Sequence, residues 1–254
     1  MTERHIHAQP IALSIAGLDP SGGAGIIADI KTFTAFGCRA LAAVTSLTFQ
    51  NSSGVYGAVH QSAEIVSNQV LPILKEFRVA CAKTGMLPTR EIIEDVARLF
   101  REEDLPAPVV DTVMRSTSGF PLIDEDAIAA LASELFPAAR LITPNIPEAE
   151  RLTGLEVMDE EGMLRAARSL REMGARAALI KGGHLAGDAV DLLDDEGHVT
   201  VFRAKRIEAG MLRGTGCMLS AAIAACLGKG MSLEESVSEA KRFITNEIRK
   251  AVTE

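Results

Sequence analysis

The sequence contains few aromatic residues and few cysteines, and it has no tryptophan. Of its 254 residues 4% are aromatic, one is a tyrosine, and the four cysteines form no CxxC pair. We therefore expect neither a disulfide framework nor a zinc site. No apolar run is long enough to cross a bilayer, and the first ten residues carry charges and two histidines where a secretion signal would have an apolar core. These absences predict a cytoplasmic protein that has no membrane partner.

An excess of positive charge is missing as well. The 26 Lys and Arg residues are outnumbered by 34 Asp and Glu residues, which gives a net charge of −8. Because nucleic-acid binding needs clustered positive charge, we expect no nucleic-acid partner. No repeat or linker divides the chain, and its length suits one large core. We expect a single domain over residues 1–254, with residues 1–9 as a flexible N-terminal segment.

Short apolar runs alternate with amphipathic helical patterns through most of the chain. This alternation predicts an α/β fold in which a mostly parallel sheet is covered by helices on both faces. The expected strands are 11–16, 41–47, 79–82, 109–110, 141–142 and 177–180, and the expected helices are 24–36, 62–76, 89–102, 124–135, 147–152 and 160–173. A hairpin over 189–194 and 198–202 and two helices starting near residues 216 and 232 complete the pattern. Ligands of such sheets bind at the carboxyl ends of the strands.

Two glycine-rich segments fall at such positions. The first, Gly17–Gly25, follows the first expected strand and would expose backbone amides to a ligand, although a tight structural turn is the alternative. The second, Gly214-Thr215-Gly216-Cys217, opens a helix of small residues. Its amides and the helix dipole would bind an anion such as a transferring phosphoryl group. Cys217 lies in the first helical turn, where the pKa of a thiol is expected to fall, and a buried structural cysteine is the alternative.

Polar residues end or follow three further strands. Asn145 and Glu148 would share a hydrated Mg²⁺, which keeps waters and takes few protein ligands, and the alternative is a helix cap with surface carboxylates. Lys181 and Gly183 end a buried strand and fit a turn beside a nucleotide. Asp111 follows another strand and is a further candidate for the region of the metal and the triphosphate.

Together these motifs resemble those of the hydroxymethylpyrimidine and phosphomethylpyrimidine kinases of thiamine biosynthesis, within the ribokinase-like fold. The resemblance extends in register from about Ile11 to Leu227. It rests on the segments 16–25, 50–51, 83–86, 111–114, 143–148, 181–184 and 214–217.

The resemblance implies a three-layer α/β sandwich, ATP with Mg²⁺, a small-molecule substrate and a homodimer. It also implies two successive phosphorylations, first of the hydroxymethyl group of 4-amino-5-hydroxymethyl-2-methylpyrimidine and then of its monophosphate. By matching positions, the resemblance implies substrate contacts at Asp29, Gln50, Met86, Val113 and Gly17, and catalytic residues at Cys217, Gly214, Thr215 and Gly216. It implies ATP-binding residues at Asp111, Asn145, Glu148, Lys181, Gly183 and Arg213. The metal would be bound by Glu148, Asn145 and Asp111, largely through water.

The sequence departs from the family pattern at two places. Thr117 and Phe120 stand where the family usually has Lys and Asp, and Met211-Leu212-Arg213 stands where it usually has Asn-Thr-His. Arg115 is a candidate replacement for the missing cation, and Arg213 is a candidate contact to the nucleotide or to a phosphate. Two other functions therefore stay open: a pyridoxal or pyridoxine kinase, and a ligand-binding paralogue with weak catalysis.

Overall fold

Strands at the centre of the described chain form one continuous sheet. The computed structural model describes residues 9–183, 187–207 and 213–253. The strands are β1 (Ile11–Leu18), β2 (Arg39–Asn51), β3 (Gly54–His60), β4 (Cys81–Thr84), β5 (Val109–Val110), β6 (Leu141–Ile142), β7 (Ala177–Lys181), β8 (Ala189–Asp195) and β9 (His198–Ala204). Their order in the sheet is β3-β2-β1-β4-β5-β6-β7-β8-β9. The strands from β2 to β7 in this order run parallel, and β3 at one edge and β8 and β9 at the other are antiparallel.

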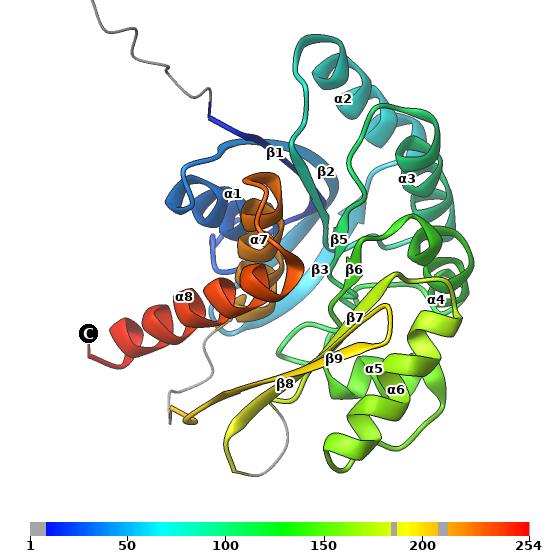
Figure 1. Ribbon diagram of the computed structural model, residues 1–254. Coiled ribbons are helices and arrows are strands. Elements are labelled where there is room, and N and C mark those ends of the chain that lie inside the picture. Colours follow the sequence, from blue (N-terminus) through cyan, green and yellow to red (C-terminus); the bar gives the residue numbers. More distant parts are fainter. Residues whose placement is uncertain (1–8, 184–186, 208–212, 254) are drawn as a thin grey trace, which may run out of the picture.

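Helices cover both faces of the sheet (Figure 1). One face carries α1 (Gly25–Ala35), α7 (Thr215–Gly228) and α8 (Leu233–Thr253), and the other carries α2 (Ala63–Glu76), α3 (Arg90–Glu102), α4 (Ala127–Ala130), α5 (Ile146–Thr153) and α6 (Glu160–Glu172). Each face has its own apolar core, and alternate residues of β1 serve both, with Leu13 and Ile15 in one core and Ala12 in the other. The expected three-layer α/β architecture is confirmed.

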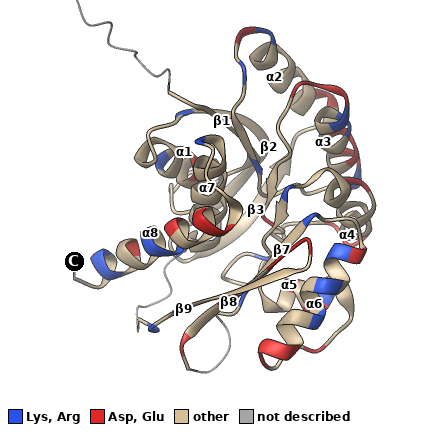
Figure 2. Ribbon diagram, viewed as in Figure 1, with Lys and Arg blue, Asp and Glu red and all other residues tan. Residues whose placement is uncertain are grey.

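Helix α7 is buried and uncharged, whereas the charged side chains lie mainly on the outer helices (Figure 2). Its first turn lies at the carboxyl edge of the sheet, because a side chain at Gly216 would come within 3.9 Å of the Asp111 carboxylate. Its last turn lies at the opposite edge, where a side chain at Gly228 would meet the sulfur of Cys81 at 2.8 Å. The small residues of α7 let it cross beneath the sheet at close range and bring its N-terminus to the expected ligand edge.

The edge formed by β2 and β3 was missed by the sequence patterns. Strand β2 continues to Asn51, four residues beyond the end expected at 47, and β3 returns antiparallel to it. This extension holds polar residues on both sides of the exposed Phe49. It therefore lacks the continuous apolar run that identified the central strands. The six parallel strands and the hairpin of β8 and β9 agree with the expectation.

The single helix expected over 124–135 is wrong in part. Helix α4 ends at Ala130, a π-helical turn follows over Leu131–Leu135, and a 3-10 turn over Phe136–Ala138 closes the segment. Pro137 lacks the N–H that would continue an α-helical ladder, so the backbone changes its hydrogen-bonding pattern before it.

Two expectations concern the limits of the described chain. None of the helices in the three described ranges combines the length and the apolar character that a membrane crossing requires. The expected flexible segment 1–9 lies outside the described residues except for residue 9, and so do His184, Met211 and Leu212.

Candidate active site

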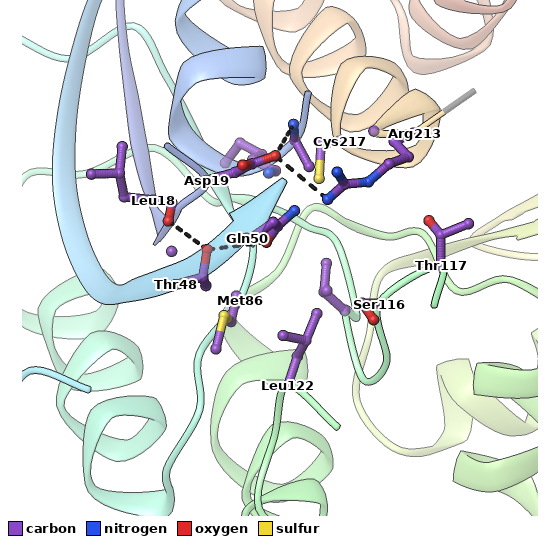
Figure 3. A pocket seen from close by; sticks show the side chains of 16 residues that line it. Leu18, Asp19, Thr48, Gln50, Met86, Ser116, Thr117, Leu122, Arg213 and Cys217 are labelled. Carbon is purple, nitrogen blue, oxygen red and sulfur yellow. Dashed lines mark hydrogen bonds and ion pairs between the residues drawn. The ribbon is translucent and has the colours of Figure 1, made fainter. Parts of the chain in front are cut away.

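A pocket lies beside the carboxyl ends of β1 and β4 (Figure 3); we call it the first pocket. Several residues singled out from the sequence line it: Gly17, Gln50, Met86, Val113, Arg213, Gly214 and Cys217. Figure 3 shows Met86 and Leu122 on the side opposite Cys217 and Arg213. Apolar side chains thus face a polar end where the second glycine-rich segment begins.

Gln50 is held in place by a neighbour on its own strand. The hydroxyl of Thr48 lies 3.0 Å from Oε1 of Gln50 and 2.9 Å from the carbonyl oxygen of Leu18. The amide of Gln50 offers a donor and an acceptor on one planar group, which suits the edge of a nitrogen-containing ring. Thr48 also lines the pocket, although it belongs to none of the motifs that mark the site in the sequence.

Asp19 organises the first glycine-rich segment. Its Oδ1 accepts hydrogen bonds from the N–H and the hydroxyl of Ser21, at 2.9 and 2.7 Å, and its Oδ2 accepts one from the N–H of Ala24 at 2.9 Å. Asp19 is buried, and it turns the loop back toward α1. Nothing in the sequence alone distinguished this aspartate from other loop acids.

The second glycine-rich segment is locked against the first. Gly214 has a φ of 75°, and a side chain there would come within 2.0 Å of the carbonyl oxygen of Gly23. Gly214 caps α7, and no side chain in the described chain caps this helix end. The amides of Thr215, Gly216 and Cys217 therefore remain available to an anion. We call residues 214–217 the anion loop.

Cys217 is a protonated thiol in this site at neutral pH. Burial raises its pKa, the nearby carboxylates of Asp111 and Asp29 raise it further, and Lys83 together with the amide of Gly25 opposes them only in part; the pKa reaches about 12. The expectation of a lowered pKa from the helix N-terminus is therefore wrong. The cost of placing a thiolate among protein atoms and carboxylates exceeds the helix-end effect.

Asp29 does not line the first pocket. It is fully buried on α1, where both oxygens accept hydrogen bonds from Lys83 Nζ at 2.9 and 2.8 Å and Oδ2 accepts one from Ser14 at 2.6 Å. Burial raises the pKa of Asp29, although its hydrogen bonds to Lys83 and Ser14 act in the opposite direction. Burial would lower the pKa of Lys83, but the negative charge of Asp29 outweighs this effect and raises it. The expected direct contact between Asp29 and a substrate is thus corrected: Lys83 reaches the pocket floor, and Asp29 supports it from behind.

A second pocket lies on the other side of the anion loop. Thr215 and Gly216 belong to its wall, together with Lys181 and Gly183. Basic side chains gather on it, namely Lys181, Lys205, Arg206 and Lys241, of which Lys241 is paired with Asp191 at 2.6 Å. Leu219, Ile244 and Ile248 supply an apolar surface. This composition suits a ligand with several negative charges and a flat apolar ring. Arg213, expected among the ATP contacts, lines the first pocket and not the second.

Asp111 and Lys181 form a pair beside the anion loop. Lys181 Nζ lies 3.0 Å from Oδ1 of Asp111, and a side chain at Gly216 would lie within 3.3 Å of the same Nζ. Burial alone would raise the pKa of Asp111, but Lys181 and Lys83 outweigh it and lower that pKa. Lys181 is thus a fixed positive charge next to the loop amides.

Asn145 and Glu148 form a reciprocal cap at the start of α5. Asn145 Oδ1 accepts from the N–H of Glu148, and Oε2 of Glu148 accepts from the N–H of Asn145, both at 2.9 Å. Thr112 donates a further bond to Oε2 of Glu148 at 3.0 Å. The helix cap is therefore present, but Glu148 is buried and is not a surface carboxylate. Burial raises the pKa of Glu148, and Asp111 adds to the rise while Lys181 opposes it.

The residues fit a Mg²⁺ ion held largely by water. No cluster of three His, Cys, Asp or Glu side chains able to hold a metal occurs within the described residues. Oε1 of Glu148 accepts no hydrogen bond from the described chain, so it can accept one from a metal-bound water. Mg²⁺ commonly binds through one or two carboxylates, several waters and the phosphates of its nucleotide.

Comparisons with known proteins give a consistent result. A sequence model of the phosphomethylpyrimidine kinase family matches residues 19–253. Over 239 residues the chain is 44% identical to a Streptomyces coelicolor protein named hydroxymethylpyrimidine/phosphomethylpyrimidine kinase, covering 94% of this chain and 88% of the relative.

Solved structures of vitamin kinases share the fold. The phosphomethylpyrimidine kinase of Clostridium difficile superimposes with a TM-score of 0.84 at 36% identity, over 94% of this chain and 100% of the other. An ADP complex of Bacillus subtilis pyridoxal kinase gives a TM-score of 0.85, also at 36% identity, over 94% and 91% of the two chains. These matches confirm the ribokinase-like fold expected from the sequence.

Proposed function

This chain belongs to the phosphomethylpyrimidine kinase family, and on that premise we propose that it transfers the γ-phosphoryl group of ATP to 4-amino-5-hydroxymethyl-2-methylpyrimidine and then to its monophosphate, in thiamine biosynthesis. A single observation supports this most strongly: the two pockets share the anion loop as a common wall. An acceptor in the first pocket and a nucleotide in the second would meet at the amides of residues 214–217.

The first pocket is the acceptor site in this proposal. Gln50 pairs with the aminopyrimidine edge, while Met86 and Val113 hold the faces of the ring. Gly17 is glycine because the sulfur of Met86 would lie 2.9 Å from any side chain there. The hydroxymethyl group then points toward Cys217 at the polar end of the pocket.

The second pocket is the nucleotide site. Lys181, Lys205 and Lys241 face the triphosphate, and Ile244 and Ile248 hold the base. The amides of the anion loop stabilise the charge on the transferring group, since phosphoryl transfer is catalysed mainly by positioning and electrostatics. Mg²⁺ supplies further neutralisation of the triphosphate when it is bound through water near Asn145, Glu148 and Asp111.

Cys217 acts as a hydrogen-bonding relay in this account. A neutral thiol with a pKa of about 12 does not remove a proton from an alcohol by itself. Its thiol is one of the groups that lower the pKa of Asp111, so the two side chains are neighbours, and the thiol can accept the proton of the alcohol while passing its own toward that carboxylate. The monophosphate is already ionised at neutral pH, and it needs no such relay.

A pyridoxal kinase is the second candidate, because a pyridoxal kinase from Bacillus subtilis shares the fold at 36% identity. A ligand-binding paralogue with weak catalysis is the third. Coupled assays of the purified protein with ATP and Mg²⁺ separate the three, with the pyrimidine alcohol, its monophosphate and pyridoxal as acceptors. Turnover of the pyrimidine alcohol is expected. Tight binding without turnover on all three would favour the paralogue.

A homodimer in the cytoplasm completes the proposal. Leu47 and Phe49 are two positions apart on β2, and Val59 of β3 pairs opposite Leu47. The three side chains are exposed, Leu47 to 42%, Phe49 to 54% and Val59 to 51%. The ring of Phe49 also lies across Gly57. We define Leu47, Phe49 and Val59 as the β2–β3 patch. Apolar side chains gathered on one exposed face mark interaction surfaces, and a second copy of the chain is the proposed occupant.

A further inference from the structure

Positive charge in the first pocket comes from two side chains among the described residues that line it, Lys83 and Arg213. Lys83 is fully buried, and Asp29 accepts hydrogen bonds from its ammonium group through both oxygens. Its charge is therefore already balanced within the protein. Arg213 differs because its side chain is 17% exposed and its partners bind it only in part.

The contacts of Arg213 hold its guanidinium in place without using up its donors. Nη1 donates to the carbonyl oxygen of Asn51 at the end of β2. Nη2 lies 3.7 Å from Oδ2 of Asp19, which is beyond hydrogen-bond distance. The oxygens of Asp19 already accept bonds from Ser21 and Ala24. A guanidinium has several N–H donors, so most of those of Arg213 remain available to a ligand.

The position of Arg213 in the chain aims it at the reacting end. It directly precedes Gly214, whose φ of 75° starts the anion loop. Figure 3 shows the guanidinium extended into the pocket toward Asp19. Arg213 thereby links Asn51, at the end of β2, to the anion loop.

The second phosphorylation creates a charge problem that this residue can solve. The monophosphate acceptor carries a charge of about −2 near neutral pH, and its phosphate must approach another anionic phosphoryl group. We propose that Arg213 binds the phosphate of the monophosphate acceptor and thereby determines the second transfer. The planar fork of arginine matches two phosphate oxygens at once. This inference rests on the proposed function and names a residue specific to its second step.

Other cations are less well placed. Arg115 is exposed, donates to the carbonyl oxygen of Gly119 and does not line the first pocket. Lys181 lies on the nucleotide side and pairs with Asp111. The sequence offered Arg115 as the replacement cation and Arg213 as a contact to the nucleotide or a phosphate; of the two, Arg213 is the one that lines the first pocket.

Steady-state kinetics with both acceptors at saturating ATP test the inference. Arg213→Gln is expected to raise KM for the monophosphate by about 10- to 100-fold, the usual effect of losing a charge-assisted hydrogen bond. KM and kcat for the alcohol should change by less than about threefold. Arg213→Lys keeps the charge and should recover part of the lost affinity. Arg115→Gln is the matched control, with both acceptors expected to behave as in the wild type.

Three results would overturn the inference, and they differ in what they leave standing. If Arg213→Gln weakens both acceptors equally, Arg213 serves the loop and not the phosphate. If the wild type phosphorylates the alcohol but not the monophosphate, the assignment of Arg213 fails while the first transfer of the proposed function survives. If the wild type turns over neither acceptor, both proposals fail.

Discussion

Gly214 illustrates how much of the site depends on one backbone conformation. Its left-handed φ and the 2.0 Å approach to the carbonyl oxygen of Gly23 together exclude any side chain. Gly214→Ala should therefore displace the anion loop and lower kcat by at least about 100-fold, the usual effect of losing one donor to a transition-state anion. Turnover assays measure this loss.

Gly230→Ala is the matched control for Gly214→Ala. Gly230 has a φ of 85°, but nothing lies within 4 Å of a side chain there. The substitution should cost about 1–2 kcal/mol of stability from backbone strain alone and leave kcat unchanged. Equal kcat values for the two variants would show that the contact between Gly214 and Gly23 does not support catalysis.

The raised pKa of Cys217 gives a kinetic signature that depends on the acceptor. Cys217→Ala should lower kcat about 100-fold for the pyrimidine alcohol, which must lose a proton, and less than about tenfold for the already ionised monophosphate. Cys217→Ser retains a group that can relay a proton and should lie between wild type and alanine. Equal losses on both acceptors would replace the relay with simple positioning.

At the scale of elements, the cap of α5 combines stability with function. The pKa of Glu148 is raised above its ordinary 4.5 by burial, so the folded protein binds its proton more tightly than the unfolded chain does. The contribution of Glu148 to stability is then greatest below pH 4.5, and it is lost as the pH rises through the folded-state pKa.

Glu148→Gln removes the unfavourable burial of a charged carboxylate, while the side-chain oxygen of Gln can still accept the hydrogen bonds from Asn145 and Thr112. The thermal stability of the variant relative to wild type should increase as the pH rises from acidic values to 7.5. The variant should also lose activity. Thermal unfolding of both proteins across this pH range measures the difference. A wild type that becomes the more stable of the two as the pH rises would contradict the assignment of the raised pKa.

The elements differ in how visible they are in the sequence. Buried strands such as Ala177–Lys181 are continuous apolar runs, and their ends locate Lys181 and Asp111 without a structure. Strand β3 has no such run, because buried, half-buried and exposed positions are mixed along both it and the end of β2. The pair of Asp29 and Lys83 joins residues 54 positions apart, so periodicity along one helix could not reveal why that acid is buried.

At the scale of the whole molecule, the sheet runs without interruption from β3 to β9, which supports the proposal of a single domain over residues 1–254. Its β3 edge carries the β2–β3 patch. Leu47→Glu should place charges against each other in the proposed dimer, shifting the mass measured by light scattering from twice 27.0 kDa to that of one chain.

Ile65→Glu is the matched control for this test. Ile65 is 47% exposed on α2, outside the β2–β3 patch, so the variant should remain dimeric. A wild-type protein that has the mass of a single chain would contradict the homodimer. A dimer that survives Leu47→Glu would place the interface elsewhere on the molecule.

The central claim is that the first pocket selects an aminopyrimidine alcohol for phosphorylation at the anion loop. Gln50 provides the polar edge for this choice, and Met86 and Val113 provide the apolar walls. The most direct measurement is the ratio of kcat/KM for 4-amino-5-hydroxymethyl-2-methylpyrimidine to that for pyridoxal, with ATP and Mg²⁺ saturating. We predict a ratio of at least about 100, as expected when a site pairs with polar groups that only one substrate presents. A ratio below one would contradict the account and identify a pyridoxal kinase.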